Sequence, residues 1–258
     1  MTYQDILVDT ADRITTITLN RPAVMNAISP NLMRELKEAI QDVSQDESCH
    51  VLIVKGAGRA FSAGVDLKAL TDQSGAPGIA NGQFTSDQLT NDANAIAQSL
   101  RTMPQPAIAV IHEHCYTGAT ELMMMFDLVI AADDAKIGDT HAKWGILPKW
   151  GMTQRLPRLV GVMKAKELSF TTRPVTGREA ERIGLVNRAV PLADLDQTVQ
   201  ELAGQILSNS AQTIAAMKHL YNEGTATTLT DGLALESALA TDITDRAEFL
   251  RDFEKNRK

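Results

Sequence analysis

Short runs made only of apolar residues recur along the chain, and they restrict its fold more than any other feature. They occupy residues 51–54, 107–111 and 128–132. A strand that is apolar at every position is buried on both faces, which is typical of parallel sheets covered by helices. Turn residues and amphipathic segments separate these runs. The pattern therefore predicts an α/β protein.

Helix and loop signals surround these runs. Ser29 and Pro30 suit the N-cap and the first position of a helix, and apolar residues follow them at helical spacing as far as residue 43. Residues 13–19 are β-branched and end in a turn, so they predict a further strand. Residues 71–91 are polar and have no periodicity, and we expect a surface loop there.

The last part of the chain differs from the rest. From Leu192 onward there is no apolar strand, and four helical segments are predicted, at residues 193–207, 211–221, 229–241 and 245–255. We therefore expect a core unit over 1–191 and a helical region over 192–258. The helical region would pack on the core or on a neighbouring subunit.

Composition excludes several classes of protein. With 25 Lys and Arg against 32 Asp and Glu, the net charge of −7 disfavours a nucleic-acid-binding protein. The two cysteines, Cys49 and Cys115, have no metal-binding or disulfide spacing, which indicates a reducing compartment. The first residues lack the features of a secretory signal, and no apolar run reaches the ~20 residues of a membrane span. We expect a cytoplasmic protein.

Two glycine-containing stretches have the features of an active site. The stretch 61–68, FSAGVDLK, must turn tightly at Gly64, and small residues around it allow a ligand to approach the main chain. The stretch 117–122, TGATEL, places Gly118 and the carboxylate of Glu121 where a strand leads into a helix. Two N–H groups, one from each stretch, could bind an oxygen that becomes negative during a reaction. The alternatives are a simple turn at Gly64 and a carboxylate that caps the helix start.

Two further stretches contain histidine. His141 lies in a stretch over 137–154 that is rich in glycine and tryptophan, where it could transfer protons near neutral pH or serve only as a structural residue. His112 and His114 would point the same way on a strand and could share a metal ion. No further ligand of matching type lies nearby in the sequence, so a metal site is disfavoured.

Taken in order, these stretches resemble the crotonase superfamily, also called the enoyl-CoA hydratase/isomerase family. The matching motifs extend over nearly the whole chain. They are Asn20-Arg21-Pro22, Met25-Asn26-Ala27, the glycine loop 61–68, the TGATEL stretch, Gly145, Pro148, Gly151, residues 153–156, Gly161, Ala180, residues 184–186 and Val190.

The resemblance implies a fold, a ligand and an assembly. The fold is a crotonase-like ββα spiral core with a helical C-terminal region that forms a homotrimer or a dimer of trimers. The substrate is an acyl-CoA thioester, with no further cofactor. The amides of Val65 and Gly118 would hold the thioester oxygen, and Glu121 would transfer protons. Contacts to the substrate would come from Ala23, Val24, Met25, Ala63, Gly64, Asp66, Leu67 and Phe253.

The chain departs from the family pattern at an informative position. Hydratases of this family use two glutamates, and the second of them falls at His141. The leading interpretation is hydration of a 2-enoyl-CoA, with Glu121 as the main base and His141 as an auxiliary group. The alternatives are a double-bond isomerase that uses Glu121 alone and a catalytically weak acyl-CoA-binding protein.

Overall fold

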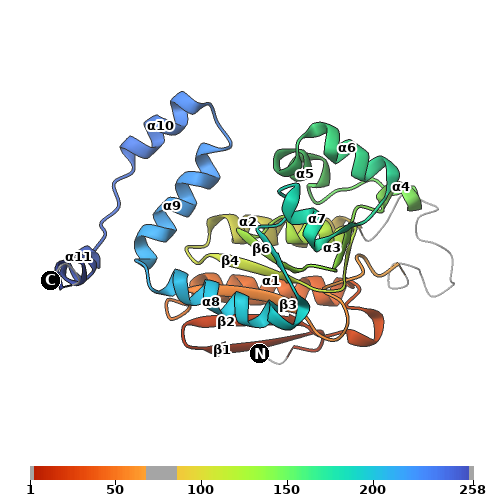
Figure 1. The fold of residues 1–258 in the computed structure, drawn as a ribbon, viewed down its shortest axis with the longest axis horizontal. Helices are drawn as coiled ribbons and strands as arrows, with labels where there is room; N and C mark the ends of the chain where they lie inside the picture. The colour runs from red at the N-terminus through yellow and green to blue at the C-terminus, as the bar shows by residue number, and fades with distance from the viewer. Residues whose placement is uncertain (1–2, 68–85, 256–258) are drawn as a thin grey trace.

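The computed structural model describes residues 3–67 and 86–255, in which a six-stranded sheet forms the centre of the molecule (Figure 1). The strand order is β1-β2-β3-β4-β6-β9; β1 and β2 are antiparallel, and all later neighbours are parallel. The strands are β1 (Ile6–Ala11), β2 (Ile14–Leu19), β3 (Val51–Gly56), β4 (Ala107–Ile111), β6 (Leu128–Ala132) and β9 (Arg188–Val190). A second sheet contains β5 (His114–Tyr116), β7 (Lys136–Gly138) and β8 (Val175–Thr176), in the order β5-β7-β8.

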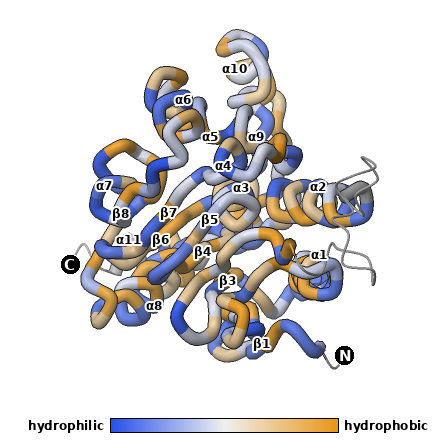
Figure 2. The backbone as a smooth tube through the Cα atoms, turned by 90° about the vertical axis from the view of Figure 1, so that its right-hand side faces the viewer, coloured by the Kyte–Doolittle hydropathy of each residue, from blue (hydrophilic) through white to orange (hydrophobic). Residues whose placement is uncertain are grey.

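Helices cover the main sheet on both sides. In Figure 2 the strands β3, β4 and β6 run between α8 (Leu195–Leu207) on one side and α1 (Pro30–Gln45) and α2 (Ser86–Thr102) on the other. Every residue of β4 is buried, as its continuous apolar sequence predicts. The remaining helices are α3 (Gly118–Met123), α4 (His141–Trp144), α5 (Met152–Val160), α6 (Val162–Thr171), α7 (Gly177–Arg182), α9 (Ala211–Gly224), α10 (Leu229–Ala238) and α11 (Arg246–Lys255), with 3-10 turns η1 (Pro22–Val24) and η3 (Leu192–Asp194).

The predicted α/β class and the apolar strands are confirmed. The predicted start of α1 is also confirmed, because the Ser29 hydroxyl accepts a hydrogen bond from the amide of Leu32 at 3.1 Å. The prediction of a loop over 71–91 is wrong at its end, since α2 already begins at Ser86. The earlier part of that expected loop, residues 71–85, lies outside the described residues.

The first strand and the second sheet were not predicted. Strand β1 has one buried residue, Ile6, so it lacks the apolar run that marks the inner strands. It lies at the edge of the sheet, with a neighbouring strand on one side only, and its five residues after Ile6 are exposed. The three strands of the second sheet are only two or three residues long, which is too short for a periodic signal.

The C-terminal region is helical, as predicted, and no strand follows Val190 among the described residues. Helix α9 is anchored by Lys218, whose buried Nζ donates to the Gln105 carbonyl at 2.8 Å and to Asp127 at 2.7 Å. Beyond it, α10 and α11 lead away from the sheet (Figure 1). The boundary at residues 191 and 192 stays a prediction. None of the described helices combines the length and the apolarity that a bilayer span requires.

Candidate active site

The topology of the sheet brings the two glycine stretches together. Strands β3 and β4 are parallel neighbours, so the segments that follow them leave the same edge of the sheet. These segments then run side by side. The amide of Ser62 donates to the His114 carbonyl at 3.1 Å, and the amide of Tyr116 donates to the Ser62 carbonyl at 3.3 Å. Residues far apart in the sequence therefore share one backbone framework.

The segment that contains η1 lies on the other side of the first glycine stretch. The amide of Ala63 donates to the Met25 carbonyl at 2.9 Å, and the amide of Ile28 donates to the Gly64 carbonyl at 2.8 Å. The buried side chain of Asn26 ties the two segments further, because it donates to the carbonyls of Ala57 and Ala60. Ala23, Val24 and Met25 thus lie beside the loop that contains Ala63 and Gly64.

Gly64 is required by its backbone conformation and by its neighbour. Its φ of +93° lies in the left-handed region, and an added Cβ would lie 2.6 Å from the Tyr116 carbonyl oxygen. This close approach brings Val65 to Gly118, where an added Cβ would lie 3.0 Å from Val65 Cγ2. Among the described residues, the amides of Val65 and Gly118 donate to no protein acceptor.

The turn into α3 places a threonine in a backbone conformation that is unusual for its side chain. Thr117 has φ 54° and ψ −111°, a conformation that a β-branched residue rarely adopts. It is held there because its amide donates to the Gly138 carbonyl at 2.8 Å and its hydroxyl contacts that of Thr140. Thr120 also bonds the Gly138 carbonyl, at 3.0 Å. These contacts fix the start of α3 and direct Glu121 into the interior.

Glu121 is 2% exposed and is held by the main chain of another loop. Its Oε1 accepts hydrogen bonds from the amides of Trp150 at 2.9 Å and Met152 at 3.0 Å. Between these two residues, Gly151 has φ +110°, a left-handed conformation that favours glycine. The Trp150 ring lies against Gly118, since an added Cβ there would be 2.8 Å from a ring carbon.

His141 faces the other oxygen of Glu121. Its Nε2 lies 3.4 Å from Glu121 Oε2, and its Nδ1 lies 2.6 Å from Asp139 Oδ1. Burial opposes the charged ring, but hydrogen bonds to Asp139 and Glu121 outweigh it and raise the pKa of His141 to about 9. A pKa raised in this direction favours the charged form of the ring at neutral pH. Although burial would raise it, the pKa of Asp139 is lowered by hydrogen bonds from His141 and Ser169.

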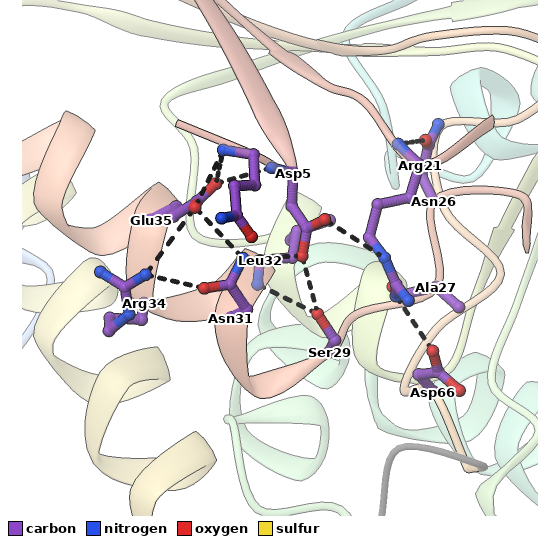
Figure 3. Close-up of polar contacts among 11 residues, drawn as sticks. Asp5, Arg21, Asn26, Ala27, Ser29, Asn31, Leu32, Arg34, Glu35 and Asp66 are labelled. Carbon is purple, nitrogen blue, oxygen red and sulfur yellow. Dashed lines mark hydrogen bonds and ion pairs between the residues drawn. The ribbon is translucent and has the colours of Figure 1, made fainter. Parts of the chain in front are cut away.

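The structure gives less information on the three remaining residues that are expected to contact the substrate, which are Asp66, Leu67 and Phe253. Asp66 is committed to a structural contact, because its carboxylate pairs with Arg21 at 3.0 Å (Figure 3). Leu67 is 40% exposed at the end of the described segment. The side chain of Phe253 lies outside the described residues, although its backbone belongs to α11. The substrate contacts of all these residues stay predictions.

The placement of His112 and His114 on one strand is wrong. Strand β5 begins at His114, and Glu113 has φ 51°, which breaks the alternation of side chains. His112 instead contacts the Gly58 carbonyl, and His114 stacks on Tyr116. Within residues 3–67 and 86–255, no three potential ligands gather around a metal position.

Sequence reasoning missed two contributors to the site. Asn26 connects the segments around the first glycine stretch, and its only signal was its place in the Met25-Asn26-Ala27 motif. Ser169 donates to Asp139 Oδ2 at 2.6 Å from α6, thirty residues along the chain. Nothing in the local sequence around Ser169 indicates this contact.

Comparisons with known proteins agree with this arrangement. Residues 9–256 match the model of the family described as enoyl-CoA hydratase/isomerase. The chain is 36% identical to a probable enoyl-CoA hydratase, echA8, of Mycobacterium tuberculosis, covering 100% of this chain and 97% of that protein. It is 32% identical to a crotonyl-CoA hydratase of Syntrophomonas wolfei, covering 100% and 98%.

A comparison with a solved structure supports membership of the same family. The crystal structure of enoyl-CoA hydratase from Bacillus anthracis superimposes with a TM-score of 0.88 at 33% identity, covering 98% of this chain and 97% of that one. The expected crotonase-like fold is therefore confirmed. The chain belongs to the enoyl-CoA hydratase/isomerase family of the crotonase superfamily.

Proposed function

We propose that this protein adds water to a 2-enoyl-CoA thioester and forms a 3-hydroxyacyl-CoA. The observation that carries the proposal has two parts. Val65 lies against Gly118, and the amides of both residues donate to no acceptor among the described residues, while Glu121, of the same helix as Gly118, forms a buried pair with His141. Relatives named enoyl-CoA hydratase and crotonyl-CoA hydratase support the same reaction.

The two amides would stabilise the charge that develops on the substrate. When a nucleophile adds to C3 of an enoyl thioester, the electron pair of the double bond moves onto the carbonyl oxygen as an enolate. Two N–H donors directed at that oxygen would stabilise this state more than the neutral carbonyl. The Trp150 ring lies against Gly118, which would supply one of these donors. This arrangement lowers the barrier to addition.

Glu121 and His141 would move the protons. Hydration requires one group that removes a proton from water and another that delivers a proton to C2. Glu121 Oε1 is occupied by two amides, whereas Oε2 faces His141 Nε2. Two groups with exchangeable protons are therefore present at one position. An isomerase needs only one such group, and the inward orientation of His141 favours hydration over isomerisation.

The CoA portion and the assembly belong to the same proposal. We assign CoA contacts to Ala23, Val24, Met25 and the 63–67 loop, and to Phe253 of α11, with no cofactor other than the thioester substrate itself.

Large apolar side chains on the C-terminal helices are exposed in the single chain, including Leu229 at 80% and Leu250 at 57%. Contact with neighbouring copies in a trimer or a dimer of trimers would cover them. We further propose a cytoplasmic location.

A substrate panel tests the function. The absorbance of the conjugated enoyl thioester is followed with crotonyl-CoA, with longer 2-enoyl-CoAs and with 3-enoyl-CoAs. We expect loss of absorbance with 2-enoyl substrates. A rise from 3-enoyl substrates, without loss from 2-enoyl substrates, would establish an isomerase instead. Binding of CoA esters without any change would establish an acyl-CoA-binding protein.

A further inference from the structure

Four side chains form a continuous chain of polar contacts that ends at Glu121. Ser169 of α6 donates to Asp139 Oδ2 at 2.6 Å, and Asp139 Oδ1 contacts His141 Nδ1 at 2.6 Å. His141 Nε2 then lies 3.4 Å from Glu121 Oε2. Asp139, His141 and Glu121 are each at most 6% exposed, so water does not compete effectively for these contacts.

Asp139 controls both the orientation and the protonation of the ring. Its Oδ1 accepts hydrogen bonds from the backbone amide of His141 at 3.0 Å and from ring Nδ1. Because a carboxylate only accepts, Nδ1 must carry a proton, and Nε2 is directed at Glu121. A second carboxylate at Nε2 favours a proton there as well. The ring is thus held between two anionic groups.

We propose that His141, held as an imidazolium by Asp139 and Ser169, is the acid that donates a proton to C2, while Glu121 is the base that acts on water. Asp139 and Ser169 are positioning residues, since they act through His141. This assignment depends on the hydration proposed above.

The proton transfers balance over one turnover. Glu121 Oε2 takes a proton from the water molecule while the water oxygen bonds to C3. The electron pair of the C2–C3 double bond moves to the thioester oxygen. The enolate collapses as His141 Nε2 gives its proton to C2. The proton on Glu121 Oε2 then passes to His141 Nε2 across their direct contact, which restores both groups. The net change is the addition of one water molecule.

The charges around the ring agree with this assignment. The charged groups that face His141 are Asp139 from its own segment and Glu121 from α3, and α6 contributes the neutral hydroxyl of Ser169. Arg155 of α5 interacts with Glu121 and helps to balance that carboxylate. Two anionic partners hold the pKa of His141 at about 9, which keeps a donor available at neutral pH.

The test combines a measurement of charge state with a measurement of turnover. The 15N and 1H signals of the His141 ring are recorded in the substrate-free protein at pH 7.5, with His141→Gln used to assign them. The pH profile of kcat/KM with crotonyl-CoA is recorded for wild type, Asp139→Asn and Ser169→Ala. We expect a doubly protonated ring and an alkaline limb near pH 9 in wild type. Asp139→Asn should lower that limb by at least one pH unit, and Ser169→Ala should lower it by a few tenths of a unit.

Control and contrary outcomes separate this inference from the proposed function. Asp92→Asn removes another buried carboxylate, one that pairs with Lys37 at 2.7 Å, and should leave the alkaline limb in place. Turnover with a neutral ring, or an alkaline limb unmoved in Asp139→Asn, would overturn the donor role and leave hydration standing. Absence of turnover with every 2-enoyl-CoA would overturn both. If Asp139→Asn does not fold, the ring signals in wild type and the Ser169→Ala profile decide the question.

Discussion

Two glutamates, Glu35 in α1 and Glu121 in α3, are buried to nearly the same extent, at 3% and 2% exposed. Each accepts hydrogen bonds from a pair of backbone amides in a different segment of the chain. Glu35 binds the amides of Gln4 and Asp5 at the start of the chain (Figure 3). Glu121 binds the amides of Trp150 and Met152.

The second oxygen distinguishes them. Both oxygens of Glu35 accept from structural donors, which are the amides of Gln4 and Asp5 and the side-chain amide of Asn31 at 3.1 Å. In Glu121 the backbone donors use one oxygen, and among the described residues the other faces only His141. A buried carboxylate is therefore structural when its oxygens are all occupied, and a candidate for chemistry when one remains for substrate or water.

Replacement of Glu121 should have the largest effect. Glu121→Gln keeps the shape of the side chain and removes its ability to accept a proton. We expect kcat for crotonyl-CoA hydration to fall by about 10³-fold, within the range of general base catalysis. Circular dichroism should show an unchanged fold. A variant that retains full activity would refute the assignment of this residue.

The substitution Gly118→Ala should cause the second largest loss of activity. In Gly118→Ala the added Cβ would lie 2.8 Å from the Trp150 ring and 3.0 Å from Val65, so the amide must move. We expect kcat/KM to fall by roughly 10²-fold or more, as when an oxyanion donor is lost. Gly204→Ala in α8 is the matched control, because an added Cβ there meets no atom within 4 Å. Equal rates in the two variants would contradict the role of Gly118.

Removal of the His141 imidazole should lower activity less than either Glu121→Gln or Gly118→Ala. His141→Gln leaves Glu121 in place but removes the second proton-transfer group, and we expect kcat to fall by about 10²-fold, at the lower end for acid–base catalysis. His219→Gln changes an exposed histidine of α9 and should leave the rate unchanged. An unaffected rate in His141→Gln would indicate that Glu121 acts alone.

Replacement of Glu35 should change stability and leave catalysis intact. Glu35→Gln turns one acceptor oxygen into a donor that faces backbone amides, and we expect it to lower the free energy of unfolding by ~1–3 kcal/mol. The denaturant midpoint measures this loss, and crotonyl-CoA turnover should stay within about twofold. Loss of activity in a folded Glu35→Gln protein would remove the distinction between the two carboxylates.

The ionisation of His141 should contribute to the pH dependence of stability. Its pKa is raised from 6.5 to about 9 in the folded protein. The stabilisation is therefore complete below pH 6.5 and is lost as the pH rises to about 9. We expect the melting temperatures of wild type and His141→Gln to converge over that interval. A difference that does not change with pH would show that the ring is neutral in the fold.

Local sequence patterns were sufficient to predict the inner strands of the sheet and the start of α1. The apolar runs over 51–54, 107–111 and 128–132 became β3, β4 and β6, because complete burial demands an uninterrupted apolar sequence. The edge strand β1 and the helix α2 were missed. In β1 one residue is buried, and the start of α2 at Ser86 lies within the polar stretch 71–91, which carries no periodicity.

The site was only partly predictable, since it is made by contacts between distant segments. Glu121 and His141 were identifiable as reactive residue types, and the residues alone suggested that the two glycine stretches could share one oxygen. The choice of the Val65 and Gly118 amides as the donors came only from family resemblance. The structure supplies the physical reason why the two stretches meet, which is that β3 and β4 are parallel neighbours. The contact of Asp139 with His141 is local, since the two residues lie two positions apart. The contact of Ser169 with Asp139 depends instead on how α6 packs, which no local pattern encodes.

The most direct test of the account is the carbonyl stretching frequency of the bound thioester. Crotonyl-CoA labelled with 13C at the thioester carbon is bound to Glu121→Gln, which should turn substrate over about 10³-fold more slowly than wild type. The 13C-edited difference infrared spectra are recorded before the substrate is consumed. Two amides directed at the oxygen should shift the carbonyl band to lower frequency than in water, and the added substitution Gly118→Ala should reverse much of that shift. A bound carbonyl with the same frequency as in water would contradict the convergence of Val65 and Gly118 on the substrate.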